Sequence, residues 1–248
     1  MYCLTDIKDC HEIKKELLNY EYVSFDMFDT LVKRNCFQPV ELFCFIEKKI
    51  DQTFHQKSHF SELRISAEKI ARKNSQKEEI TFDDIYQYLQ SEFSDEILSQ
   101  IKKWELEYEF SFCQFNPAIK SIYDYCLLNN KKILVVTDIY LPESLIKNIL
   151  DKVGVRYNLL FVSSSYNATK YRGSLFKMIL SKLSISASEI IHIGDNKKSD
   201  YLIPRKLGIN AVFIQKDTAC NLFLAKKKYN QSSSYKNLCS FISNHVPH

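Results

Sequence analysis

Residues 23–32, VSFDMFDTLV, place two acidic residues directly after a short apolar run. The run reads as a buried β-strand, with Asp26 at its end and Asp29 three residues further on. Open α/β sheets bind their ligands beyond the carboxyl ends of their strands, so a carboxylate placed there points to a site. The stretch therefore predicts a first strand that delivers Asp26 to a site, and it leaves open whether either acid is a nucleophile.

The composition is that of an ordinary globular protein and excludes several function classes. Of 248 residues, 45% are hydrophobic and 26% are charged, and the formal net charge is only +4. The basic residues are scattered, so no nucleic-acid partner is expected. No apolar stretch approaches the roughly 20 residues of a membrane span, and no signal peptide is evident, so we expect a cytoplasmic protein. The eight cysteines form no C-x-x-C pair, which favours buried thiols over a metal cluster.

Apolar strands alternate with amphipathic helices in the second half of the chain. Strands are expected at KILVVT (132–137), LLFVSS (159–164), EIIHIGD (189–195) and NAVFIQ (210–215), and helices at 117–128, at 143–152, from 174 and at 200–207. Continuous apolar strands of this kind indicate a parallel sheet with helices on both faces.

Helical patterns fill the rest of the first half. Helices are expected at 6–20, from Pro39, and at 60–73, 82–91 and 95–112. Thr81 and Asp84 resemble a capping box at the start of one of them. These helices follow the first strand directly and precede the second, so they indicate an insertion.

The predicted fold is therefore α/β: a Rossmann-like parallel sheet with helices on both faces and a helical cap inserted after the first strand. We expect residues 1–34 and 114–220 to form the discontinuous core and residues 35–113 to form the cap. Residues 221–248 are expected to be a C-terminal tail or helix.

Polar side chains gather at the carboxyl ends of the predicted strands. They are Asp26, Thr137, Asp138, Asp195 and Asp200, with Lys170 in a strand-to-helix loop. Gly194 is expected to let the backbone turn sharply, so that Asp195 and Asp200 converge. Clustered carboxylates need a cation, and hard oxygen ligands favour Mg²⁺. Mg²⁺ beside a nucleophilic aspartate, a hydroxyl and a lysine is typical of phosphoryl transfer.

These motifs resemble, in order, the four motifs of the haloacid-dehalogenase-like hydrolase superfamily. FDMFDTL carries Asp26 and Thr30, VVTD carries Thr137, ATKYRGSLF carries Lys170, and GDNKKSD carries Asp195 and Asp200. The resemblance covers about residues 20–215 and includes a cap of the C1 type. More narrowly, SFDMFDTL, TDIYLP and K-x-x-G-x-L-F resemble bacterial members found alone or attached to surface-polysaccharide glycosyltransferases. This implies a role in polysaccharide biosynthesis beside such an enzyme.

The resemblance also implies a role for each residue. Asp26 would be the nucleophile of a phosphoaspartyl intermediate, with Thr137 and Lys170 as its catalytic partners. Substrate binding would involve Thr30, Thr137, Asp138 and Lys170, and Mg²⁺ would be held by Asp26, Asp195, Asp200 and the backbone carbonyl of Phe28. Thr30 sets the register, because taking Asp29 as nucleophile would put Leu31 at the second motif position.

Phe28 departs from the pattern of the family's phosphatases, which carry an aspartate at this position. That aspartate protonates the leaving oxygen and then activates water, which is typically worth about 10²–10⁴ in rate. Dehalogenases of the family carry an aromatic residue here, but they need no metal, so the intact GDNKKSD motif argues against carbon–halogen cleavage.

Three hypotheses follow from Phe28. In the first, Asp29 or another group supplies the proton, and the protein is a phosphatase for a small phosphorylated metabolite such as a sugar phosphate or a nucleotide. In the second, the leaving group needs little protonation, or the phosphoryl group passes to an acceptor other than water. In the third, the fold is catalytically degenerate and only binds a phosphorylated ligand or a partner. We predict the phosphatase.

Three of the polar residues also have structural interpretations. Asp29 is equally well explained as a cap of the turn that leaves the strand. Asp138 is read as an N-cap or as a group that orients Lys170. His192 lies within an apolar strand and is expected to be a core histidine with its hydrogen bonds satisfied.

Overall fold

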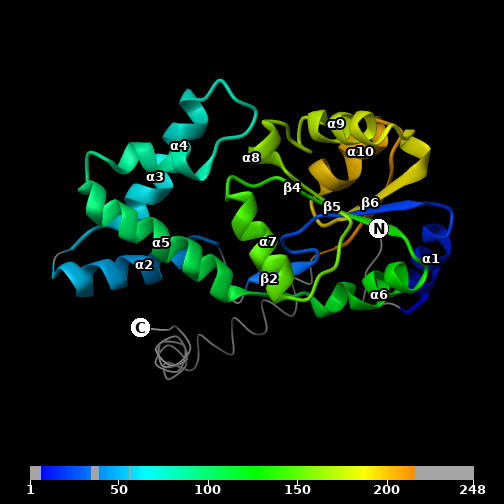
Figure 1. The fold of residues 1–248 in the computed structure, drawn as a ribbon, viewed down its shortest axis with the longest axis horizontal. Coiled ribbons are helices and arrows are strands. Elements are labelled where there is room, and N and C mark those ends of the chain that lie inside the picture. The colour runs from blue at the N-terminus through cyan, green and yellow to red at the C-terminus, as the bar shows by residue number, and fades with distance from the viewer. Residues whose placement is uncertain (1–6, 35–38, 56, 216–248) are drawn as a thin grey trace.

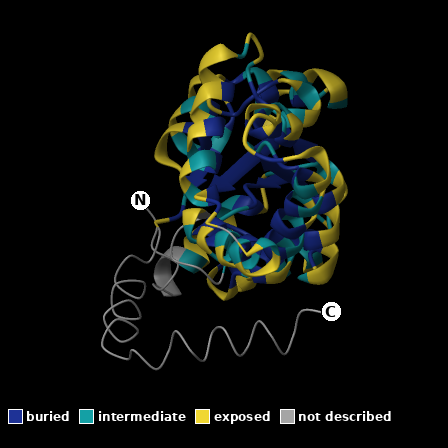
Figure 2. Ribbon diagram, turned by 90° about the vertical axis from the view of Figure 1, so that its left-hand side faces the viewer, coloured by how far each residue is buried: buried dark blue, intermediate teal, exposed yellow. Residues whose placement is uncertain are grey.

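The computed structural model describes residues 7–34, 39–55 and 57–215, and the tail predicted at 221–248 lies outside them. Within these residues, no helix is both long enough and apolar enough to pass through a bilayer. Figure 2 shows that the strands at the centre are buried, whereas the outward sides of the helices are exposed.

Five parallel strands form the central sheet, in the order β5-β4-β1-β6-β7 (Figure 1). The strands are β1 (Tyr22–Phe25), β4 (Lys132–Thr137), β5 (Leu159–Val162), β6 (Ile190–Gly194) and β7 (Asn210–Phe213). All neighbouring pairs are parallel, and the first strand lies in the middle of the sheet. The predicted parallel α/β sheet is confirmed.

Helices cover both faces of this sheet, because successive residues of a strand point to opposite sides. The core helices are α1 (Ile7–Leu17), α6 (Lys120–Leu128), α7 (Glu143–Lys152), α8 (Ser163–Tyr166), α9 (Ser174–Leu183) and α10 (Ile203–Lys206). In β4, Ile133 and Val135 face α1, α6 and α7, whereas Leu134 and Val136 face α9 and α10. All four side chains are buried, which explains why the strand reads as an unbroken apolar run.

A second group of helices lies between β1 and β4 in the chain and makes up the predicted cap. Its members are α2 (Pro39–Phe54), α3 (Phe60–Asn74), α4 (Phe82–Tyr86) and α5 (Asp95–Phe112). The chain leaves and re-enters the core through an antiparallel pair, β2 (Val32–Arg34) and β3 (Cys113–Phe115). The insertion after the first strand is thus observed, while its boundaries at 35 and 113 stay a prediction.

The capping box expected in the cap is present. The Thr81 hydroxyl accepts from the Asp84 backbone N–H at 3.1 Å, and the Asp84 carboxylate accepts from the Thr81 backbone N–H at 2.8 Å. The helix that it starts is shorter than the predicted 82–91, because the chain tightens into a 3₁₀ turn at Gln87–Leu89.

Several predicted elements of the core differ in their extent, among them the helix at 6–20, which ends at Leu17, and the strand at 210–215, which ends at Phe213. The strand expected at 159–164 ends at Val162, and Ser163 instead starts α8. The helix expected at 200–207 begins earlier, as a π-helical turn at Lys197–Leu202 that continues into α10. The Asn196 side chain caps its first turn, because its Oδ1 atom accepts hydrogen bonds from the backbone N–H groups of Lys198 and Ser199. Sequence periodicity does not register such a local cap.

Candidate active site

The sheet register brings the carboxyl ends of β1 and β6 together. Phe25 is in register with Val135 of β4 and with Ile193 of β6. The Asp26 backbone N–H donates to the Ile193 carbonyl oxygen at 2.8 Å, which extends the ladder by one residue. Asp26 and Asp195 therefore leave neighbouring strands at the same edge of the sheet.

Three carboxylates and one ammonium group lie together at this edge. One carboxylate oxygen from each of Asp26, Asp195 and Asp200 lies within 4.8 Å of the others. Lys170 Nζ donates to Asp26 Oδ1 at 2.5 Å and to Asp200 Oδ1 at 2.6 Å. Asp26, Lys170 and Asp200 are only 8%, 2% and 1% exposed, so water screens these interactions weakly. The structure thus brings together four of the residues that the motifs singled out.

The charged groups of this cluster shift one another's pKa values. Burial, together with the charges of Asp200 and Asp195, raises the pKa of Asp26 well above its usual value, although Lys170 opposes the shift. Burial also disfavours the charged form of Asp200, but Lys170 and His192 hold the pKa of Asp200 below its usual range. Three carboxylates this close together repel one another when ionised, so a bound cation would stabilise their charged forms. A divalent cation with oxygen ligands, such as Mg²⁺, fits this donor set.

Gly194 leaves the space that Asp200 occupies. A Cβ atom on Gly194 would lie 2.5 Å from both Cβ and Cγ of Asp200, which is far inside van der Waals contact. The backbone of Gly194 is outside the left-handed region, unlike that of Gly173 and Gly208. The sequence interpretation named the right residue but the wrong reason: glycine is needed for close approach and not for a sharp turn.

Thr30 contacts the cluster, and Thr137 ends the strand that pairs with β1. The Thr30 hydroxyl is buried and donates to Asp195 Oδ1 at 3.1 Å. Thr137 is the last residue of β4 and is only 1% exposed. Thr30 therefore fixes the orientation of Asp195, while substrate contacts of either threonine stay a prediction.

Asp138 supports the loop that carries Lys170. Its carboxylate accepts from the backbone N–H of Lys170 at 2.7 Å and from that of Tyr171 at 3.0 Å. The N-cap position of α7 belongs to Pro142, so the N-cap interpretation of Asp138 is wrong. The other structural interpretation, that Asp138 orients Lys170, agrees with these two hydrogen bonds. Its predicted contact with substrate is untested.

His192 is a satisfied core histidine, as expected, and it also contacts the site. It is fully buried, with Nδ1 2.7 Å from the Ser24 hydroxyl and Nε2 3.3 Å from Asp200 Oδ1. Burial lowers the pKa of His192, which favours the neutral ring. We assign the proton to Nε2, because only then do both ring nitrogens have a complementary partner. In the sequence, the contact between His192 and Ser24 is indicated only by the presence of one polar residue in each of two apolar strands.

Asp29 lies outside the buried cluster. It is exposed, its φ is 64°, and its backbone N–H donates to the Val32 carbonyl oxygen at 2.7 Å. Aspartate is among the few residues that adopt this conformation readily. The turn interpretation of Asp29 is therefore supported by the geometry, and its catalytic role stays a prediction.

Phe28 lies under a guanidinium group. The Arg34 guanidinium carbon is 3.8 Å from the centroid of the Phe28 ring. Arg34 Nε in turn donates to Glu109 Oε2 of α5 at 2.8 Å, so Arg34 links the strand pair at the base of the cap to a cap helix. Phe28, which replaces the aspartate of the phosphatase pattern, is thus a half-buried ring with the Arg34 guanidinium stacked on it.

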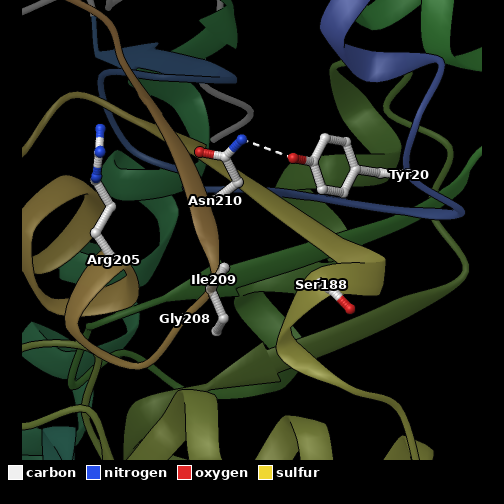
Figure 3. A pocket seen from close by; sticks show the side chains of 6 residues that line it. All are labelled: Tyr20, Ser188, Arg205, Gly208, Ile209 and Asn210. Carbon is white, nitrogen blue, oxygen red and sulfur yellow. Dashed lines mark hydrogen bonds between the residues drawn. The ribbon is translucent and has the colours of Figure 1, made fainter.

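A separate hollow of about 340 Å³ opens at the opposite edge of the sheet (Figure 3). It is lined by Tyr20, Ser188, Arg205, Gly208, Ile209 and Asn210. Several of these residues precede β1, β6 or β7, so the hollow lies at the amino ends of the strands. It is therefore distinct from the carboxylate cluster.

Comparison with known proteins supports the fold. Neither a protein-family model nor a curated protein matches the sequence. Among solved structures, an HAD phosphatase from Thermococcus onnurineus aligns with a TM-score of 0.57 at 18% identity, over 79% of this chain and 87% of that one. A 2-haloacid dehalogenase from Pseudomonas syringae pv. Tomato aligns with a TM-score of 0.57 at 15% identity, over 78% and 86%.

A third structure is an HAD family enzyme from Bacteroides thetaiotaomicron in complex with magnesium and inorganic phosphate. It aligns with a TM-score of 0.53 at 13% identity, over 80% of this chain and 96% of that one. The fold is that of haloacid-dehalogenase-like hydrolases. Phosphatases and dehalogenases share this fold, so the choice between them depends on the site.

Proposed function

We propose that the protein is a Mg²⁺-dependent phosphatase that acts on a small phosphorylated metabolite through a phosphoaspartyl intermediate on Asp26. The observation that carries the proposal is the cluster in which oxygens of Asp26, Asp195 and Asp200 lie within 4.8 Å of one another and the Lys170 ammonium group contacts Asp26 and Asp200. Such a cluster is suited to a divalent cation and an anionic substrate. Carbon–halogen cleavage needs no cation site of this kind.

Each step of the reaction follows from the chemistry of the cluster. The Asp26 carboxylate attacks phosphorus, the phosphorus–oxygen bond of the ester breaks, and the leaving oxygen takes up a proton. Water then attacks the phosphorus of the acyl phosphate, which returns the Asp26 carboxylate and releases phosphate. Lys170 already contacts Asp26, so it lies where it would bind the oxygens of the transferring phosphoryl group, and Thr137 would donate a hydrogen bond to them.

The same residues would hold the metal ion. Asp26, Asp195 and Asp200, with the backbone carbonyl of Phe28, would hold Mg²⁺, which when bound supplies positive charge to the phosphate oxygens and stabilises the charged carboxylates. The enzyme of this fold from Bacteroides thetaiotaomicron is in complex with magnesium and inorganic phosphate, which makes Mg²⁺ the first cation to test here.

Transfer to an acceptor other than water is a second candidate function, and Phe28 is the observation that favours it. A ring covered by Arg34 cannot give a proton to the leaving oxygen, and Asp29 faces solvent. A substrate with a good leaving group would need little protonation, and a hydroxyl acceptor would replace water in the second step. The resemblance to bacterial members beside surface-polysaccharide glycosyltransferases makes sugar phosphates the first substrates to test, in a protein that we expect to be cytoplasmic.

The first experiment measures phosphate release from sugar phosphates, nucleotides and an activated aryl phosphate, with and without Mg²⁺. We expect Mg²⁺-dependent release that Asp26→Asn lowers by about 10⁴-fold or more, because the nucleophile is lost. Asp124→Asn is the matched control, since Asp124 lies on the surface and pairs with Lys120. Undiminished release by the Asp26→Asn variant would refute the phosphoaspartyl route. A folded wild-type protein that binds Mg²⁺ but releases no phosphate from any substrate would favour the degenerate binding domain.

A further inference from the structure

One loop of the cap reaches the core beside the lysine of the site. This loop, residues 75–81, joins α3 to α4, and in Figure 1 it extends from the cap toward α8. Its contacts with the core come from two consecutive glutamates, Glu78 and Glu79. Their partners lie in residues 163–174, the segment that includes Lys170.

The Glu78 carboxylate bonds to both sides of Lys170 in the chain. Its Oε2 atom accepts from the Thr169 backbone N–H at 3.3 Å and from the Ser174 hydroxyl. The Thr169 hydroxyl lies 3.5 Å from the same oxygen. A side chain of the cap thus serves as an acceptor for the loop between α8 and α9, about 90 residues further along the chain.

Asn167 fixes the backbone of the same cap loop. Asn167 has a φ of 48°, and its Oδ1 atom accepts hydrogen bonds from the backbone N–H of Glu78 at 2.8 Å and from that of Glu79 at 3.4 Å. The Ser163 hydroxyl donates to Glu79 Oε2 at 3.1 Å, and Glu79 is 5% exposed. We call these contacts the latch; its members are Glu78, Glu79, Ser163, Asn167, Thr169 and Ser174.

The loop of Lys170 is therefore held from two sides. From the core, Asp138 accepts from the Lys170 backbone N–H at 2.7 Å. From the cap, Glu78 binds Thr169 and Ser174. If this loop shifted, Lys170 would lose its short contacts with Asp26 and Asp200, because a buried ammonium group has few alternative positions.

We propose that Glu78 is a positioning residue for Lys170, so that the placement of the cap sets the placement of the phosphate-binding lysine. The role of Lys170 rests on the proposed function, whereas the coupling between Glu78 and the loop does not. Displacement of the cap loop breaks the latch and loosens residues 167–174. The cap thus contributes to catalysis through the loop that it holds and without a contact of Glu78 with substrate.

The test compares Glu78→Ala with Glu78→Gln and with Glu92→Ala. Glutamine keeps an acceptor oxygen for the Thr169 N–H and the Ser174 hydroxyl, so Glu78→Gln should restore much of what alanine removes. Glu92 is an exposed cap glutamate whose hydrogen bond comes from the adjacent Ser91, which makes it a matched control. Asn167→Gly is a second latch variant, because glycine tolerates the positive φ while it removes the Oδ1 acceptor.

The first measurement is amide hydrogen exchange of the full chain, which needs no activity. In Glu78→Ala we expect peptides from residues 167–174 to exchange about tenfold faster, with near wild-type rates in Glu78→Gln and Glu92→Ala. Asn167→Gly should speed exchange in both 77–80 and 167–174. Unchanged exchange of 167–174 in the folded alanine and glycine variants would overturn the coupling.

The second measurement is steady-state kinetics on whichever phosphate ester the wild-type protein hydrolyses. Glu78→Ala should lower kcat by about tenfold, because Lys170 is then misplaced in the transition state, and Glu78→Gln should recover most of the loss. Faster exchange with unchanged kcat and KM would mean that the latch joins cap and core without positioning Lys170. If the protein is no phosphatase, the exchange experiment still decides whether the cap holds this loop.

Discussion

The cap and the core both bury charged side chains, but they balance them differently. In the cap, Arg64 Nε and Nη2 donate to the two carboxylate oxygens of Glu105 at 3.0 and 2.8 Å. The Tyr86 hydroxyl donates to Glu105 Oε2 at 2.7 Å, and both charged side chains are fully buried. In the core, three carboxylates lie together, and one ammonium group contacts two of them.

The difference separates a structural network from a site. The cap network is closed: the Arg64 guanidinium meets the Glu105 carboxylate in a bidentate pair and also contacts Glu68, and the Tyr86 phenol occupies part of the remaining acceptor capacity of Glu105. In the core cluster, by contrast, three carboxylates lie within 4.8 Å of one another, and the buried Lys170 ammonium group contacts two of them. Clustered carboxylates are costly unless a proton or a ligand offsets their charge, so we take this cluster as the candidate functional centre.

The largest effect is expected when the closed cap network is broken. Arg64→Met leaves Glu105 charged, buried and without its cation, which should cost about 3–5 kcal/mol of unfolding free energy. The triple variant Arg64→Met/Tyr86→Phe/Glu105→Leu removes the buried pair together with the phenol and leaves Glu68 paired with Arg72, so it should recover most of that loss. Urea unfolding followed by circular dichroism measures both.

The control for this pair is an exposed one in the same helix. Lys103 lies 3.9 Å from Glu107, and both side chains are well exposed, so Lys103→Met should cost less than about 1 kcal/mol. If Arg64→Met were as mild as Lys103→Met, the cap would not contain the closed pair, and the contrast with the core would fail.

The same contrast explains what the sequence could predict. The core site was predictable because Asp26 and Asp195 follow apolar runs, and parallel strands deliver such residues to one edge. In the cap, Arg64 and Glu105 have the sequence context of a solvated helix face, as in SELRISAEK and KWELEYE. Whether such residues face outward or inward depends on which helix packs against them, and that information is tertiary.

Contacts between the two regions were beyond prediction for a related reason. Glu78 and Asn167 are separated by 89 residues, and neither stands in a periodic pattern. For Gly194 the residue was foreseen but its purpose was not, because the clash that glycine avoids involves Asp200, which folds back from the following turn. Local patterns identify which residues matter more readily than they identify their partners.

A smaller effect is expected from crowding the core site. In Gly194→Ala the new Cβ would meet Asp200 at 2.5 Å, so the backbone or Asp200 must move, at a cost of about 1–3 kcal/mol. Displacement of Asp200 should also weaken Mg²⁺ binding by about tenfold or more, measured by calorimetric titration of the metal alone.

Gly154→Ala separates the two consequences. A Cβ on Gly154 would meet no atom within 4 Å, but its φ of +73° is strained for alanine, which should cost about 1–2 kcal/mol. Because Gly154 follows α7, away from the carboxylates, its variant should bind Mg²⁺ like the wild type. Equal Mg²⁺ affinity in both glycine variants would show that Asp200 is not a ligand whose position Gly194 protects.

The smallest effect is expected where the two regions meet, at Phe28. Phe28→Asp introduces a carboxyl group beside the Arg34 guanidinium, which Glu109 of the cap already binds. We expect release of phosphate from an alkyl ester to rise about tenfold at acidic pH, where the new group carries its proton, a gain near the lower limit of general acid–base help, and release from an activated aryl phosphate to stay unchanged. Only the poor leaving group needs the proton.

The pH dependence and an isosteric control, Phe28→Asn, show whether the gain comes from the new acid. A neighbouring cation lowers the pKa of a carboxyl group, so Arg34 should keep the new group ionised over most of the pH range. The gain in leaving-group protonation should therefore grow as the pH falls and vanish as the pH rises. Phe28→Asn removes the ring without adding an acid, and an equal gain in that variant would assign the effect to lost stacking with Arg34. A gain confined to Phe28→Asp would instead show that the core supplies the nucleophile and the cation site, and that the missing function is the acid.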